Sequence, residues 1–226
     1  MLVPHSVGRT LLIALGICTI NYTGSAREPA NEPGVVVHYC SGCHGRDGNS
    51  QLPYVPRLAG LSAAYLESRL ATYRKAVPAT VDEPFARILH TSSARTHVAL
   101  TAAATEQMVG MAKRLSEDDL KAAARWYSAQ RRASAKSTTG HVVEQGRDLY
   151  MKGLQSRGVP ACQSCHGPEG RGTEVAPQLA GQHAPYVVAQ LTQFRTGARR
   201  QSSMTNVARS LEPNEEQALA AYLQSK

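Results

Sequence analysis

Apolar residues recur at helical spacing in two stretches of the chain, one near its middle and one at its C-terminus. The first stretch follows Ser116, which can cap a helix and has an acid three positions later. The second begins near Pro213, which suits a first helical turn, and Glu215 and Glu216 there complement the helix dipole. The apolar positions are Leu120, Ala123, Ala124 and Tyr127, followed by Ala218, Leu219, Tyr222 and Leu223. Strand signals are weak throughout, so the pattern predicts an all-α protein.

The same pattern occurs twice, which indicates a tandem duplication. The matching segments include Pro56–Gly60 with Pro177–Gly181, and Met108 and Leu115 with Met204 and Leu211. The offset between the copies is nearly constant at first and becomes shorter later in the repeat. The first copy therefore carries an insertion around residues 76–100.

Residues 131–140 lie between the copies and are polar, basic and free of large apolar side chains. Such composition is typical of an interdomain linker. A chain of 226 residues allows two small domains. We therefore expect one domain at 27–130 and a second at 141–226.

The N-terminal residues have the features of a cleaved export signal. Arg9 is followed by a short apolar run at 11–20 and then by small residues. This run is too short for a membrane span, which needs about 20 apolar residues. Cys18 raises the alternative of a lipoprotein, but Ile17 stands where a small residue is needed. Residues 1–26 are predicted to be a signal peptide, which implies a periplasmic location.

Composition excludes one class of function and leaves one problem. Lys and Arg number 25 against 17 Asp and Glu, but an exported chain without a basic, aromatic-interleaved stripe does not suit nucleic-acid binding. The chain has only 2 Phe, 9 Tyr and 1 Trp. Two domains with so few aromatic residues have thin cores unless something besides side chains fills them.

Four cysteines outside the leader form two Cys-x-x-Cys-His motifs. Their residues are Cys40, Cys43 and His44, then Cys162, Cys165 and His166. Disulfides are the default in an exported protein, and paired cysteines also occur in zinc ribbons and thioredoxin-like sites. Zinc ribbons, however, place their pairs about 15 to 20 residues apart, far closer than here, and a thioredoxin-like site explains neither histidine.

The motif matches the attachment signal for c-type haem. Its spacing lets two thiols reach the two vinyl groups on one porphyrin edge, and the next residue can bring its imidazole to the iron. The sequence therefore predicts two covalently bound haem c groups. Each macrocycle would also supply the apolar core that the aromatic count leaves missing.

A haem held by one histidine has a sixth coordination position, and its ligand separates carriers from catalysts. Only Met108 and Met204 occupy equivalent positions in the two copies. We predict that these methionines are the sixth ligands, although methionine is more often a flexible core residue. Met111 is expected to be such a core residue. His90 and His97 lie in the insertion, where either is an alternative to Met108.

The chain resembles the di-haem class I cytochromes c of the cytochrome c4 family. The resemblance runs from about residue 33 to the C-terminus and rests on both haem motifs, both Pro-x-Leu-Ala-Gly segments and both Met-x6-Leu patterns. It implies two tandem helical domains whose haems face each other near the domain interface. It also implies that His44 and Met108 bind one iron, and that His166 and Met204 bind the other.

In such folds a proline carbonyl accepts a hydrogen bond from the ligand imidazole. The resemblance therefore points to Pro56 and Pro177, with Pro53 as a rival in the first copy. One departure concerns the segment Gly197–Arg199, because the first copy has the insertion in its place.

The resemblance also implies a function. Its members are periplasmic carriers of single electrons between respiratory-chain partners, such as a quinol-oxidising complex and a terminal oxidase. Two alternatives are the electron-accepting subunit of a periplasmic dehydrogenase and a di-haem oxidoreductase with catalysis at the first haem. Met ligation of both irons favours a carrier, whereas an open or His-ligated first iron favours catalysis. We assign no catalytic residue, and we expect membrane association only through partners.

Overall fold

The computed structural model describes residues 32–76, 92–134 and 139–226. The predicted signal peptide and His90 lie outside these residues. The first repeat contains a π-helical turn (Val36–Cys40), α1 (Ser41–His44), α2 (Ala63–Lys75), α4 (Ser92–Arg114) and α5 (Glu117–Ala129). The second contains α6 (His141–Lys152), α7 (Gln163–His166), α8 (Ala184–Thr196), α9 (Ser202–Arg209) and α10 (Pro213–Gln224), with short 3-10 turns at Gln155–Arg157 and Pro168–Gly170. The described residues contain no strand beyond one isolated bridge between Leu154 and Val159, so the all-α prediction is confirmed.

Both predicted helix starts are present. The Ser116 hydroxyl accepts from the amide of Asp119 at 3.1 Å, and the Asp119 carboxylate accepts from the amide of Ser116 at 3.2 Å. Helix α10 begins at Pro213, where Glu212 and Glu215 form a second capping box. These reciprocal bonds satisfy amide groups that the first helical turn leaves without partners.

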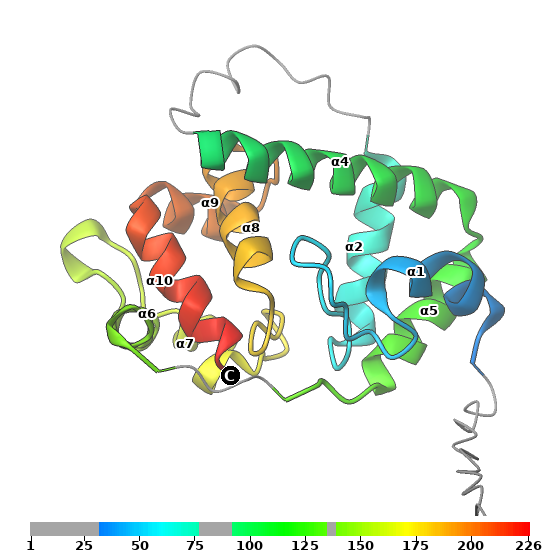
Figure 1. The fold of residues 1–226 in the computed structure, drawn as a ribbon, viewed down its shortest axis with the longest axis horizontal. Coiled ribbons are helices and arrows are strands. Elements are labelled where there is room, and N and C mark those ends of the chain that lie inside the picture. Colours follow the sequence, from blue (N-terminus) through cyan, green and yellow to red (C-terminus); the bar gives the residue numbers. More distant parts are fainter. Residues whose placement is uncertain (1–31, 77–91, 135–138) are drawn as a thin grey trace, which may run out of the picture. The chain divides into compact units, whose positions relative to one another are not determined.

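Each repeat has its own apolar core. The first core contains Val35, Val36, Leu61, Leu66, Leu115, Leu120, Ala123, Ala124 and Tyr127. The second contains Leu149, Tyr150, Val159, Val187, Leu191, Phe194, Ala208, Leu211, Leu219, Ala220, Tyr222 and Leu223. Helix α2 packs against α4 and α5, and α10 packs against α6 and α8 (Figure 1). The Cys-x-x-Cys-His turns precede α2 and α8 in the chain, so each lies within its own repeat.

Helix α4 contains the later part of the predicted insertion. It runs without a break through 23 residues, whereas its counterpart α9 has 8. It contacts α2 of its own repeat and also α8 of the second repeat (Figure 1). None of the helices in the described ranges is long and apolar enough to span a membrane.

Candidate functional site

The four predicted haem-attachment cysteines are free thiols in the structure. Cys43 and Cys165 are exposed, while Cys40 and Cys162 are partly buried. Burial raises the pKa of both Cys40 and Cys162 to about 11, since the apolar surroundings disfavour a thiolate. No disulfide joins them, and no group of three or more His, Cys, Asp and Glu in the described residues is arranged to hold a metal ion.

Both predicted ligand histidines are buried and oriented in the same way. His44 Nδ1 donates to the carbonyl oxygen of Pro56 at 3.0 Å, and His166 Nδ1 donates to that of Pro177 at 2.9 Å. Burial lowers the pKa of each imidazole, and the bond to proline offsets this only in part. The rings are therefore neutral, with the proton on Nδ1 and a lone pair on Nε2 for a metal. The structure selects Pro56 over Pro53 as the partner of His44.

The loop that carries each proline is folded back by one glycine carbonyl. Gly48 O accepts from the amides of Leu58 at 2.7 Å and Ala59 at 3.2 Å, and Gly170 O accepts from the amide of Leu179 at 2.7 Å. Gly48 has a φ of +73°, and an added Cβ would lie 2.7 Å from the nitrogen of Ala59. A larger residue would therefore push away the loop whose proline holds His44.

The turn that follows each histidine is anchored by a tyrosine. Tyr127 donates its hydroxyl to Gly45 O at 3.0 Å, and Tyr150 donates to Gly167 O at 2.7 Å. Gly45 and Gly167 are equivalent in the repeat, but the tyrosines come from α5 and α6, which are not. Burial raises the pKa of both hydroxyls, so each remains a donor. Sequence comparison of the copies missed both anchors because the tyrosines do not align.

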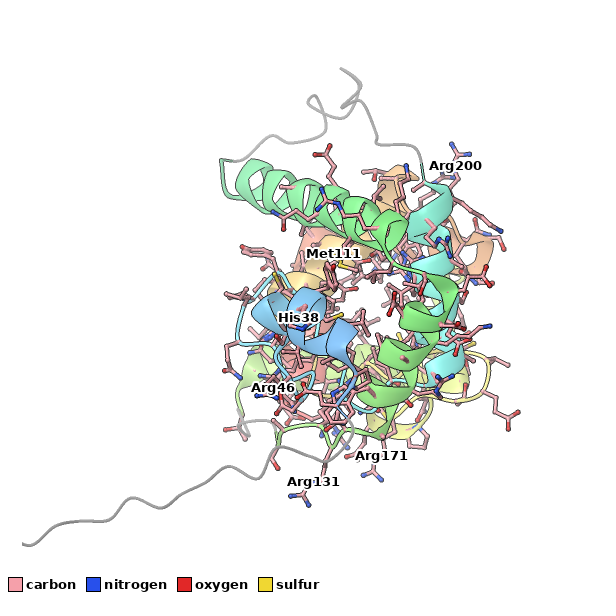
Figure 2. The ribbon with its side chains drawn as sticks, turned by 90° about the vertical axis from the view of Figure 1, so that its right-hand side faces the viewer. His38, Arg46, Met111, Arg131, Arg171 and Arg200 are labelled. Atoms are coloured by element: carbon pink, nitrogen blue, oxygen red, sulfur yellow. The ribbon has the colours of Figure 1, made fainter. Side chains whose placement is uncertain are left out.

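The predicted sixth ligands lie on the helices that precede α5 and α10. Met108 is partly buried on α4, and Met204 is partly buried on α9 against the second core. The Met204 amide donates to Gln201 Oε1 at 2.7 Å, which caps the start of α9. Met111 packs against the first core (Figure 2), as the sequence predicts. His97 lies in α4, but its side chain is outside the described part.

Residues to which the sequence assigned no contact connect the repeats. Arg199 Nη2 donates to the hydroxyl of Tyr65 at 3.2 Å, and its guanidinium lies 4.5 Å from the ring centroid of Phe194. Arg199 belongs to the segment that the first copy lacks. Arg132, from the predicted linker, and Gln182 also bridge the repeats. The one sequence feature that could have pointed to these contacts is that the three residues lie in or beside the segments that the copies were compared by.

Known proteins are similar to this chain over most of its length. The family model described as "Cytochrome c" matches residues 143–226. Cytochrome c4 of Stutzerimonas stutzeri is 33% identical over 222 residues, covering 95% of this chain and 96% of that protein. The thiosulfate dehydrogenase electron acceptor of Thiomonas intermedia (strain K12) is 32% identical, covering 81% of this chain and 76% of that protein. The crystal structure of reduced recombinant cytochrome c4 from Pseudomonas stutzeri superposes with a TM-score of 0.70 at 31% identity, covering 87% of this chain and 98% of that one.

Proposed function

Because the chain belongs to the cytochrome c4 family of di-haem class I cytochromes c, we propose that it carries single electrons between respiratory-chain proteins of the periplasm, towards a terminal oxidase. Members of this family carry covalently bound haem c and transfer electrons. The observation that carries this proposal is the repeated geometry in which a buried, neutral histidine donates to a proline carbonyl. When bound, each haem supplies a one-electron ferric–ferrous couple.

The residues present fit two haem c groups. In each repeat one cysteine of the pair is exposed and the other is partly buried, and the histidine that follows has its Nε2 lone pair available. We assign attachment of the first haem to Cys40 and Cys43, and attachment of the second to Cys162 and Cys165. The domains would span 27–130 and 141–226 around these groups.

We infer that His44 and Met108 would hold the iron of the first haem, and that His166 and Met204 would hold the iron of the second. The proline carbonyls hold each imidazole in one tautomer and one orientation, which keeps the metal bond the same through successive turnovers. Soft thioether ligands raise the reduction potential of an iron. A carrier needs this constancy, because little reorganisation then accompanies each electron transfer.

The oxidised-state absorption spectrum tests this assignment. Two Met-ligated irons should give a far-red sulfur-to-iron band of the intensity expected for two haems per chain. Met108→Ala and Met204→Ala should each remove about half of that intensity, since the two sites are equivalent. Met111→Ala is the matched control, because Met111 packs against the core and should leave the band unchanged. A band of single-haem strength that survives Met108→Ala would contradict the carrier assignment and direct attention to His90 and His97.

A second function is supported by a specific comparison. Proteins named thiosulfate dehydrogenase electron acceptor are similar to this chain over 81% of its length, so its partner could be a periplasmic dehydrogenase in place of a quinol-oxidising complex. Stopped-flow reduction distinguishes the two: rapid reduction by a purified thiosulfate dehydrogenase, with slow reduction by a quinol-oxidising complex, would favour the dehydrogenase partner.

A further inference from the structure

The Pro-x-Leu-Ala-Gly segments of the two repeats contact each other through equivalent residues. Arg57 Nη1 donates to Gly181 O at 2.8 Å. Gln178 occupies the position of Arg57 in the second copy. With its amide oriented so that both the nitrogen and the oxygen have hydrogen-bond partners, Gln178 Nε2 donates to Gly60 O at 3.3 Å. The same bond is therefore made twice in opposite directions, as in an interface with two-fold symmetry.

Arg132 joins two equivalent carbonyl groups at this interface. Its Nε and Nη2 donate to Ala59 O at 3.2 and 3.0 Å, and its Nη1 donates to Ala180 O. Burial, together with the nearby charge of Arg57, lowers the pKa of Arg132 to about 10, so the guanidinium stays charged at neutral pH. Although the sequence places Arg132 in a polar linker, its side chain lies between the repeats.

A second, uncharged contact joins the same segments. Gln182 Oε1 accepts from the amide of Arg57 at 2.9 Å, and Gln182 Nε2 donates to the carbonyl oxygen of Arg57 at 3.1 Å. The next residue, His183, donates from Nε2 to Ser50 O at 2.8 Å. Gln182 and His183 are both buried, so these bonds are shielded from water and the segments are held tightly.

The joined segments are the ones that orient the ligand histidines. Ala59 and Ala180 each lie three residues after the proline whose carbonyl accepts from His44 or His166. Each segment is also held by a glycine carbonyl inside its own repeat. A movement of one repeat against the other therefore has to break bonds in the loops next to both imidazoles.

We propose that Arg132 is a positioning residue that fixes the mutual orientation of the two haems, and thereby the rate of electron exchange between them. A planar guanidinium suits this role because its donors diverge, so that one group can reach both carbonyls, whereas a lysine ammonium is a point charge on a flexible chain. This inference rests on the proposed function, because it requires a haem in each repeat.

Circular dichroism of the oxidised holoprotein in the Soret region tests the inference. Two neighbouring haems couple to give a two-signed band whose amplitude depends on their mutual orientation and not on either haem alone. Because charge-assisted hydrogen bonds are strong, Arg132→Met should increase the fraction of molecules in which the two repeats have separated by about tenfold or more. The two-signed band should shrink and electron exchange between the haems should slow, while the far-red band of each haem stays unchanged.

Three variants make the test specific. Arg131→Met removes the neighbouring arginine, whose exposed side chain points away from the ribbon (Figure 2), and should leave the two-signed band as in the wild type. Arg132→Lys keeps the charge but not the two-pronged contact, so its two-signed band should also be smaller than that of the wild type. Gln182→Ala removes the uncharged contact and should weaken the band without shifting the potentials.

Two results would overturn the inference: a wild-type band in Arg132→Met, or a fully restored band in Arg132→Lys. Failure of the proposed function is distinguishable, because it appears in the unmutated protein as fewer than two haems per chain or a missing far-red band.

Discussion

The two repeats build the same histidine site on different supports. In the second repeat, α6 precedes the Cys-x-x-Cys-His turn and supplies Tyr150, whose hydroxyl holds Gly167 O. In the first repeat, the π-helical turn Val36–Cys40 is the one helical segment that precedes the corresponding turn among the residues described from 32 onwards, and Tyr127 of α5 holds Gly45 O instead. The comparison teaches that the carbonyl at this turn needs a donor, whereas the helix that supplies the donor can change.

The largest difference lies between α4 and α9. Both helices carry a predicted methionine ligand, but α4 is 23 residues long and reaches α8 of the other repeat, while α9 has 8 residues. Helix α4, which contains the later part of the predicted insertion, thus connects the two repeats. Because α4 is also tied to α2, the predicted Met108 side of the first site depends on both repeats.

A third difference concerns acids near the start of the last helix. Glu216 in α10 is only 2% exposed, and its Oε1 lies 3.2 Å from Arg195 Nη1. The equivalent arginine of the first repeat, Arg74, faces the exposed Glu117 at 3.9 Å. An arginine–glutamate pair therefore has a buried carboxylate in the second repeat and an exposed carboxylate in the first.

Loss of haem attachment should have the largest effect on stability. Cys43→Ala and Cys165→Ala each remove one covalent link, and each repeat has few aromatic residues to replace the macrocycle in its core. We expect both variants to be unstable and to lose haem, with a clear fall in the thermal unfolding temperature. Haem-to-protein ratio and calorimetry measure this directly. Normal thermal stability in either variant would contradict the view that folding depends on haem.

Glu216 should make the stability of the second repeat depend on pH. Burial raises its pKa to about 7, and Arg195 offsets this only in part. A carboxyl whose pKa is raised in the folded state stabilises the fold at low pH, and this contribution is lost as the pH rises through about 7. Between pH 5 and pH 8 the free energy of unfolding of the wild type should fall, through Glu216, by about 1 to 3 kcal/mol. Glu216→Gln should lack this fall when the two proteins are compared by denaturant unfolding at both pH values. Parallel pH profiles of the two proteins would show that Glu216 is charged in the fold.

The exposed pair of the first repeat should contribute little. Glu117→Gln removes the partner of Arg74, and a surface ion pair at this distance is worth about 0 to 1 kcal/mol. We expect a change in the free energy of unfolding below about 0.5 kcal/mol. This variant is the matched control for Glu216→Gln. An effect as large as that of Glu216→Gln would mean that burial is not what separates the two pairs.

Sequence alone determined the local features of this protein. The starts of α5 and α10 follow from Ser116 and Pro213, because caps and helical spacing act within a few residues. The two Cys-x-x-Cys-His motifs and the repeated segments predicted the haem sites, and the family resemblance pointed to Pro56 and Pro177 as the partners of the histidines, with Pro53 as a rival in the first copy. The pairing of each methionine with its iron remains a prediction from the same repeat.

Only the tertiary structure decided what lies between distant segments. It placed Arg132 against Ala59 and Ala180, it buried Glu216, and it extended α4 to contact α8. No local pattern marks these features, because each depends on groups brought together from far along the chain. A charged residue in a polar stretch has the composition of a solvated linker whether or not two carbonyl oxygens lie within reach, and only the packing of the two repeats determines that they do.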